Sequence, residues 1–170
     1  ISIIVPTYNT PIIFLKEMID SVIAQSYGNW QLCIADGSQG NKELEAALDA
    51  YSKADSRIIY KVLDRNLGIA GNTNAALDMA EGEIVGLLDH DDTLEPNALY
   101  EVVKALQDKD VDVVYTDEDK ILGPDWKNVN PNFKPDFNID LLRSYNYITD
   151  FYCVKTELIK EVGGFSDKYD

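Results

Sequence analysis

Short apolar runs alternate with segments of helical periodicity along nearly the whole chain, and this alternation limits the fold more than any other feature. Residues 1–5 and 84–88 are almost continuously apolar, as strands buried on both faces of a sheet are. Over residues 15–22, apolar side chains recur at i, i+3, i+4 and i+7, which is the spacing of one helical face. This alternation predicts an α/β fold with a mostly parallel, Rossmann-like sheet flanked by helices.

The same patterns predict the positions of the elements. Strands are expected at residues 1–5, 30–35, 58–63, 84–88, 111–115 and 151–154, and helices at residues 11–25, 44–51, 72–80, 96–106, 140–144 and 156–162. The last helix is expected to end at Gly163 and Gly164. Residues 123–138 contain three prolines and little periodicity, so a long loop is predicted there.

The composition excludes several classes of protein. The 170 residues suffice for one domain, and their hydrophobic fraction of 45% is that of a globular chain. The formal net charge of −15 argues against nucleic-acid binding and against a basic helix on a membrane surface. No apolar run approaches the roughly 18 residues of a membrane span. Cys33 and Cys153 lie in strand-like runs without metal-ligand spacing, so we expect buried, reduced thiols and a cytoplasmic protein.

Both ends of the sequence look cut. The chain opens inside a strand-like run without a Met, and residues 165–170 show no evident terminus. No signal peptide leads the chain. We therefore expect residues 1–170 to be a single domain from the N-terminal part of a longer protein, with any membrane association supplied by other parts of that protein.

Three predicted strands end at a carboxylate. Strand 30–35 leads to Asp36, strand 84–88 to Asp89, and strand 111–115 to Asp117. Ligands of parallel α/β sheets bind at the carboxyl ends of the strands. If these strands are parallel, the three carboxylates gather at one edge of the sheet, and a binding site is predicted there.

Residues 89–92, Asp-His-Asp-Asp, are the most distinctive of these segments. Carboxylates this close raise one another's pKa unless a positive charge lies between them. A divalent cation with oxygen ligands would relieve the repulsion, whereas the alternative is a solvated acidic turn before the helix at Pro96. An EF-hand loop does not fit, because its sixth and twelfth positions would be Leu94 and Tyr100.

Other segments are less specific. Tyr8 follows the first strand and is either a core aromatic residue or a platform on which a base stacks. Residues 36–38, Asp-Gly-Ser, are typical of a simple turn. Residues 65–71 form a loop with two glycines before a helix, where a phosphate can approach, but they match neither a Walker loop nor a dinucleotide fingerprint. Residues 117–119 are either a second acidic site or a solvated loop.

In their order and spacing, these segments resemble the inverting nucleotide-sugar glycosyltransferases of family 2, which have the GT-A fold. The resemblance covers essentially the whole chain and is carried by residues 2–9 (SIIVPTYN), residues 35–38 (ADGS), Asn66, Gly68 and Asn74, and residues 88–92 (LDHDD) with Pro96. Residues 115–120 (YTDEDK) and 132–136 (NFKPD) resemble a bacterial subgroup that makes cell-surface polysaccharide or O-antigen and includes rhamnosyltransferases.

The resemblance implies the roles of individual residues. The implied nucleotide site comprises Pro6, Tyr8, Asp36, Asn66, Gly68, Asn74 and Asp89. Asp91 of the D-x-D motif would be the main ligand of Mn²⁺ or Mg²⁺, with Asp89 facing the metal or the ribose. Asp117 and Asp119 are assigned to the acceptor side. The family often carries Arg where this chain has Thr73, and Arg65 is the alternative contact.

The implied reaction transfers a sugar from a UDP- or dTDP-sugar to a hydroxyl of a saccharide or a lipid-linked saccharide, with inversion. The family's base follows a Gly-Gly-Phe segment within a Glu-Asp or Gln-Asp pair, and this chain ends at Asp170 before such a pair. We therefore assign no base and expect it after Asp170. The alternatives are an inactive nucleotide-sugar-binding module, a nucleotidyltransferase, whose Gly-rich first loop is missing here, and a receiver-like domain.

Overall fold

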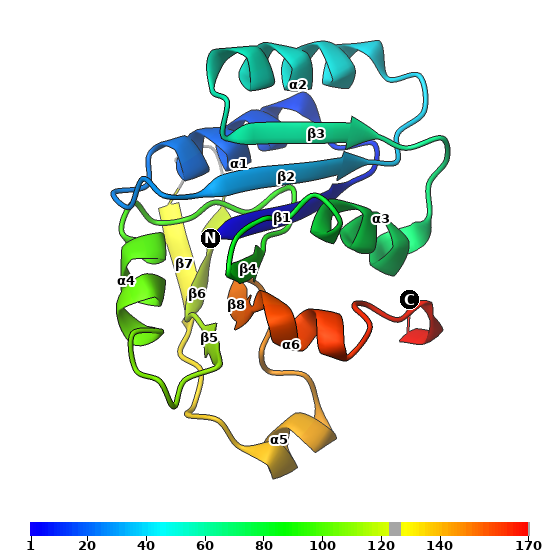
Figure 1. Cartoon of the computed structure of the whole chain (residues 1–170). Helices are drawn as coiled ribbons and strands as arrows, with labels where there is room; N and C mark the ends of the chain where they lie inside the picture. The colour runs from blue at the N-terminus through cyan, green and yellow to red at the C-terminus, as the bar shows by residue number, and fades with distance from the viewer. Residues whose placement is uncertain (123–126, 170) are drawn as a thin grey trace.

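The computed structural model describes residues 1–122 and 127–169, and its centre is a six-stranded sheet in the order β3-β2-β1-β4-β8-β5 (Figure 1). The strands of this sheet are β1 (Ser2–Thr7), β2 (Gln31–Asp36), β3 (Ile58–Val62), β4 (Ile84–Leu87), β5 (Val113–Tyr115) and β8 (Tyr152–Lys155). A separate hairpin consists of β6 (Glu118–Leu122) and β7 (Lys127–Asn132). The helices are α1 (Ile12–Ile23), α2 (Lys42–Ala54), α3 (Gly68–Leu77), α4 (Ala98–Ala105), α5 (Ile139–Ser144) and α6 (Thr156–Glu161), followed by the 3₁₀ turn η1 (Asp167–Tyr169).

The strand directions confirm the predicted mostly parallel sheet. β2 pairs in parallel with both β1 and β3, and β1 pairs in parallel with β4. β8 is antiparallel to both β4 and β5, so β5 runs in the same direction as β4. The carboxyl ends of β2, β4 and β5 therefore lie at the same edge of the sheet, as the sequence predicted.

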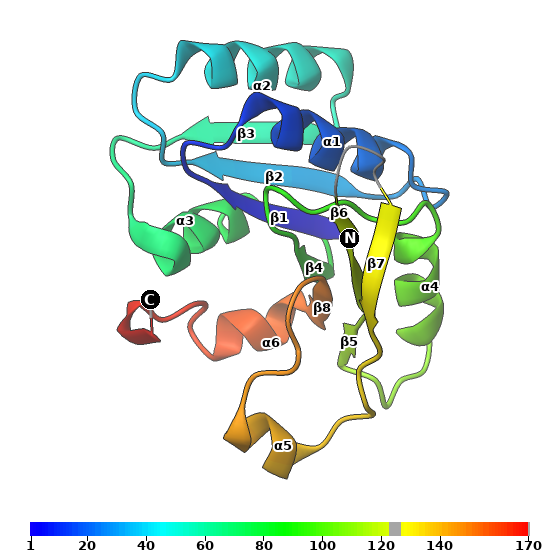
Figure 2. The same cartoon turned by 180° about the vertical axis from the view of Figure 1, so that it is seen from behind.

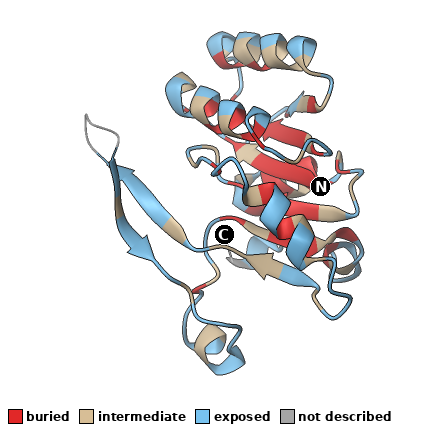
Figure 3. Cartoon of the chain, turned by 90° about the vertical axis from the view of Figure 1, so that its left-hand side faces the viewer, coloured by how far each residue is buried: buried red, intermediate tan, exposed pale blue. Residues whose placement is uncertain are grey.

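Helices cover both faces of the sheet (Figures 1 and 2). Because side chains alternate along a strand, Ile3 and Val5 of β1 face one core while Ile4 faces the other. The buried stripes of α1, α2 and α4 pack in the first core. α3 and α6 contribute to the second core. Figure 3 shows the central strands buried and the β6–β7 hairpin and α5 largely exposed.

The hairpin is the largest departure from the sequence-based expectation. A loop was predicted over residues 123–138, but residues 127–132 form β7, which pairs with β6. A strand leaves a period-two hydrophobic signal only where one of its faces is buried, and most residues of β6 and β7 are exposed. Residues 123–126 of the predicted loop lie outside the described residues.

The third helix begins earlier than predicted. It was expected at residues 72–80, whereas α3 starts at Gly68. The Asn66 Oδ1 atom accepts from the Gly68 N–H at 3.1 Å, and the Asn72 Oδ1 atom accepts from the Leu67 N–H at 3.0 Å. These side chains satisfy backbone donors at the start of the helix, so the glycines there do not prevent helix formation.

Two smaller expectations concern the cysteines and the membrane. Cys33 in β2 and Cys153 in β8 are free and buried, and burial raises the pKa of each thiol to about 12. Both thiols are therefore protonated and inert at neutral pH, as predicted.

Within the described part of the chain, no helix has the length and apolar character needed to cross a bilayer.

Candidate functional site

The loops that follow β1, β2 and β4 meet at the carboxyl edge of the sheet. Thr7 is the register partner of Asp36, and the Gly37 N–H donates to the Thr7 carbonyl oxygen at 2.9 Å. On the other side of β1, the Leu88 N–H donates to the Ile4 carbonyl oxygen at 3.2 Å. The register therefore places the turn after β2 and the acidic loop after β4 on either side of the end of β1.

Asp36 is buried at this edge, and its two carboxylate oxygens differ in their hydrogen bonds. Its Oδ1 atom accepts from the Thr7 hydroxyl at 3.0 Å and from the Ser38 N–H at 3.0 Å. Its Oδ2 atom is also buried, but it has no hydrogen-bond partner among the described residues. Leaving a buried acceptor unpaired costs about 1–3 kcal/mol. A ligand N–H group that reached this oxygen would satisfy it, although Asp36 is covered in this structure and does not line the pocket described below.

The turn that carries Asp36 packs tightly on the loop before α3. A Cβ atom on Gly37 would lie 2.9 Å from the Asn72 Nδ2 atom and 3.2 Å from the Asn66 Oδ1 atom, so a larger residue there would have to displace both side chains. Asn72 Nδ2 also donates to Asn66 Oδ1 at 2.9 Å. Asn66, predicted to bind the nucleotide, is thus placed beside Asp36 and orders the loop that leads to Gly68.

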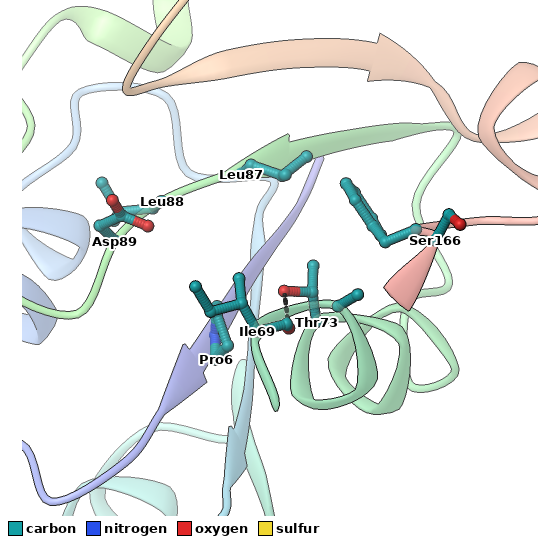
Figure 4. Close-up of a pocket in the computed structure, with 9 residues that line it drawn as sticks. Pro6, Ile69, Thr73, Leu87, Leu88, Asp89 and Ser166 are labelled. Atoms are coloured by element: carbon teal, nitrogen blue, oxygen red, sulfur yellow. Dashed lines mark hydrogen bonds between the residues drawn. The ribbon is translucent and has the colours of Figure 1, made fainter. Parts of the chain in front are cut away.

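A pocket of about 190 Å³ lies between the sheet edge and α3 (Figure 4). Its lining residues are Pro6 from β1, Ile69, Ala70 and Thr73 from α3, Leu87, Leu88 and Asp89 from the end of β4, and Phe165 and Ser166 from the segment after α6. Asp89 and Ser166 lie at opposite ends of the group of side chains. The pocket is mainly apolar, with a single carboxylate at its rim.

Of the other residues that the resemblance assigned to the nucleotide, Tyr8 is open to a ligand and Asn74 is not. Tyr8 is 51% exposed, so it is not a core aromatic residue and its ring is available to a ligand. Asn74 does not line the pocket, because both ends of its side-chain amide bond to the backbone of Phe165. Thr73, where the family often has Arg, lines the pocket and donates its hydroxyl to the Ile69 carbonyl oxygen at 2.7 Å. Arg65 lies exposed in the preceding loop.

Residues 89–92 follow β4 and concentrate negative charge. Asp89 is exposed at the pocket rim, yet the protein atoms packed behind it, together with the charge of Asp91, raise its pKa. Burial and the neighbouring carboxylates raise the pKa of Asp92 to about 6. The His90 Nδ1 atom lies 3.7 Å from an oxygen of Asp91. Burial and mutual repulsion therefore both disfavour the charged forms of Asp89 and Asp92.

A cation at this loop would need ligands from outside the protein. In residues 1–122 and 127–169, no cluster of three or more His, Cys, Asp or Glu side chains is arranged to hold a metal ion. Mg²⁺ is commonly held by one or two carboxylates and completed by substrate phosphates and water. Asp89 and Asp91 are two exposed carboxylates in one short loop, which is the number of protein ligands that such an arrangement requires.

The acidic segment after β5 is organised around a lysine that received no role from the sequence. Lys134 has a side chain only 2% exposed, and its Nζ atom lies 2.6 Å from Glu118 Oε2 and 3.9 Å from Asp150 Oδ2. The same ammonium donates to the Thr149 carbonyl oxygen. Hydrogen bonds from Asp150, Lys134 and Asn132 lower the pKa of Glu118 to about 2. Lys134 lies between Phe133 and Pro135 in the sequence, far from its partners at residues 118 and 150, so no local sequence signal indicated the cluster.

The two residues assigned to the acceptor side lie apart from the pocket. Asp117 Oδ1 accepts from the Lys134 N–H at 2.8 Å, so it fixes the chain next to the buried lysine. Asp119 is exposed on β6. The charges of Glu118 and Asp150 contribute to raising the pKa of Asp92, which places this cluster near the loop after β4.

Comparison with known proteins identifies the family. The family model described as "Glycosyl transferase family 2" matches residues 2–161. The chain belongs to glycosyl transferase family 2. An uncharacterized protein, y4gI, of Sinorhizobium fredii is 40% identical over 171 residues, covering 100% of this chain and 19% of the relative. The O-antigen biosynthesis protein RfbC of Myxococcus xanthus is 33% identical over 171 residues, covering 100% of this chain and 13% of the relative. The chain thus spans less than a fifth of either relative.

Solved structures confirm the GT-A fold of this family 2 domain. Residues 1–349 of S. aureus TarS, in complex with UDP, superpose with a TM-score of 0.75 at 21% identity, covering 99% of this chain and 50% of that one. The mannosyltransferase PcManGT of Pyrobaculum calidifontis, in complex with GDP-Man and Mn²⁺, gives a TM-score of 0.73 at 22% identity, covering 97% and 47%.

Proposed function

We propose that this domain binds the donor of an inverting, divalent-metal-dependent glycosyltransferase that builds cell-surface polysaccharide. The observation that carries the proposal is the edge of the sheet, where the buried Asp36 and the acidic loop at residues 89–92 lie on either side of β1. A nucleoside diphosphate offers what the two sites need, namely an N–H donor at the base and phosphate oxygens that share a cation with carboxylates. Family 2 membership supports this proposal.

The base of the nucleotide is proposed to be uracil or thymine. Both carry an imide N–H, and Asp36 Oδ2 is an acceptor with no partner among the residues that the structure describes. Cytosine has an unprotonated ring nitrogen at the same position, which would meet that oxygen with repulsion. Tyr8 offers an exposed ring on which the base can stack, and Asn66, two residues before α3 begins at Gly68, adjoins the Asp36 turn.

We propose that Asp91 and Asp89 hold Mn²⁺ or Mg²⁺ together with the donor diphosphate. When bound, the cation supplies positive charge that stabilises the departing diphosphate. The Mn²⁺ and GDP-Man bound by the Pyrobaculum mannosyltransferase support this assignment. Asp89 is the carboxylate that lines the pocket, so it orients the donor towards the apolar walls. We assign no residue of this chain as the base that accepts the proton of the acceptor hydroxyl.

The acceptor is proposed to be a saccharide or a lipid-linked saccharide. The relative RfbC is named for O-antigen biosynthesis, and another relative of Bacillus subtilis is described as a putative teichuronic acid biosynthesis glycosyltransferase. Residues 115–120 and 132–136, which carry the resemblance to such enzymes, form the β6–β7 hairpin and its surroundings, so we place the acceptor on that side. The free, buried cysteines fit the cytoplasmic location expected from the sequence.

Calorimetry on the full-length protein tests the donor site. We expect UDP or dTDP to bind only with Mn²⁺ or Mg²⁺ present, and CDP to bind much more weakly. Asp91→Ala should abolish the metal-dependent part of binding. Asp36→Asn keeps the shape of the side chain but presents an amide N–H₂ where Oδ2 was, because the Ser38 N–H holds the remaining oxygen in place. This variant should weaken binding about 10- to 100-fold.

The control is Asp78→Asn, which removes an exposed charge at the end of α3. Two results would contradict the proposal. One is that Asp91→Ala binds the nucleotide as tightly as the wild type does. The other is that neither UDP nor dTDP binds when the metal is present. Transfer of a labelled sugar from the bound donor to an acceptor separates an enzyme from a nucleotide-sugar-binding module, which would bind without transfer.

A further inference from the structure

One side chain ties the segment after α6 to the middle of α3. Asn74 Nδ2 donates to the Phe165 carbonyl oxygen at 2.8 Å, and Asn74 Oδ1 accepts from the Phe165 N–H at 2.9 Å. The two residues are 91 positions apart in sequence. A single amide that pairs with both backbone groups of one residue fixes its distance and its orientation together, as a pair of strand hydrogen bonds does.

The chain approaches Asn74 through two glycines that permit the contact. Gly163 and Gly164 have φ angles of +86° and +77°, in the left-handed region that other residues rarely adopt. A Cβ atom on Gly164 would lie 2.6 Å from Asn74 Oδ1. The backbone conformation and the missing side chain at Gly164 are therefore both required for the Asn74–Phe165 contact, which we call the α3 clamp.

The α3 clamp determines one wall of the donor pocket. Phe165 and Ser166 line the pocket, with Ser166 at the end opposite Asp89 (Figure 4). The other lining residues come from β1, α3 and the end of β4, elements that pack against the cores of the sheet. This wall comes from the segment that follows the last helix, where the Phe165 side chain packs against the second core and the α3 clamp fixes the Phe165 backbone.

We propose that Asn74 is a positioning residue for sugar transfer, which acts by holding Phe165 and Ser166 against the donor. The inference rests on the proposed function. Asn74 itself does not line the pocket, so it acts through the backbone of Phe165 rather than by touching the nucleotide. The anchors of the donor at the sheet edge do not depend on the α3 clamp. Breaking the clamp therefore leaves the donor bound but poorly aligned.

The test compares Asn74→Ala with Asp78→Ala in the full-length protein. Asp78 lies one turn further along the same helix and is exposed. For Asn74→Ala we expect kcat to fall about 10- to 100-fold, as misplacement of a reactant by about an ångström does. The dissociation constant of UDP with Mn²⁺ should stay within about threefold of the wild-type value. Asp78→Ala should change neither quantity.

Hydrogen exchange shows whether loss of the α3 clamp causes the expected fall in kcat. The Phe165 N–H bonds to Asn74 Oδ1, so a peptide covering residues 163–169 should exchange faster in Asn74→Ala, while peptides from β1 and β4 should not change. Loss of protection throughout the sheet would instead mean a general loss of stability and would overturn the inference.

Gly164→Ala disrupts the same contact by placing a methyl group against the Asn74 side chain. It should lower kcat by a similar factor and keep nucleotide binding, and it serves as the test if Asn74→Ala does not fold. The two changes should not be additive, because removing the Asn74 amide removes the atom that the new methyl group would meet. We expect Gly164→Ala to lower kcat at least threefold less in the Asn74→Ala background than in the wild type.

Failure of the proposed function and failure of the inference look different. A wild-type protein that neither binds UDP or dTDP nor transfers sugar contradicts the proposed function. An active wild type with an equally active Asn74→Ala variant, or a variant whose nucleotide affinity falls as much as its kcat, overturns only the positioning role of Asn74.

Discussion

β1 and β2 are buried along almost their whole length, whereas β6 and β7 are exposed on both faces (Figure 3). The parallel sheet therefore holds its site by burial and backbone register, so that Asp36 and Asp89 are placed by strands that cannot slip without exposing their apolar faces. The hairpin lacks such a core and is held instead by the buried ammonium of Lys134 and the carboxylates around it. Changes in the two regions should accordingly differ in size and in extent.

The largest effect is expected from a matched pair of isoleucines. Ile34 is fully buried in β2, and Ile121 is 43% exposed in β6. Ile34→Ala should lower the free energy of unfolding by about 2–5 kcal/mol, because it removes buried methyl groups and leaves a cavity. Ile121→Ala should change it by less than about 0.5 kcal/mol. Urea denaturation measures both, and similar effects would contradict the contrast between the regions.

The second effect concerns the lysine that holds the hairpin. Lys134→Met should destabilise the chain by about 1–3 kcal/mol, because it leaves Glu118 and Asp150 without their buried cation. The loss should be local, with faster hydrogen exchange in β6 and β7 and little change in β1 and β2. The control is Lys155→Met, since Lys155 pairs with Asp112 on the surface and such pairs contribute little. If β6 and β7 exchange hydrogen equally fast in Lys134→Met and Lys155→Met, Lys134 does not hold the hairpin.

The contrast also explains how far the sequence alone could lead. The parallel strands, their helices and the shared edge of Asp36, Asp89 and Asp117 were predictable, because burial imposes a readable period and parallel strands share their ends. The hairpin was missed because exposed strands carry no such period. Lys134 was missed because its partners come from residues 118 and 149–150, which only the tertiary fold brings together. The backbone contacts of Asn74 are likewise long-range.

The third effect is a pH dependence of the stability of the hairpin, which arises from Glu118. The pKa of Glu118 lies at about 2 in the folded chain, below its ordinary value of 4.5. A lowered pKa means that the folded state favours the carboxylate, so its contribution to stability is present above about pH 4.5 and is lost as the pH falls towards 2. Burial and Glu118 raise the pKa of Asp150, so Asp150 takes up its proton first and opposes part of the change. The measurement is the rate at which a protease cleaves the hairpin in the wild type and in Glu118→Gln. The difference between the two rates should shrink as the pH falls from 4.5 to 2. A difference that does not change with pH would contradict the role of the Glu118 carboxylate.

The smallest effects separate the two carboxylates that the sequence assigned to the acceptor side. Asp117→Ala removes an acceptor from the Lys134 N–H, so it should lower the free energy of unfolding by about 1 kcal/mol or less. Asp119→Ala lies on an exposed strand and should leave stability unchanged. A stability-neutral change is the more informative one for function, because any rise in the KM of the acceptor then reflects a lost contact with substrate. If Asp119→Ala leaves that KM unchanged while Asp117→Ala alters stability alone, the acceptor contacts lie elsewhere, and Asp117 serves only to hold the backbone at Lys134.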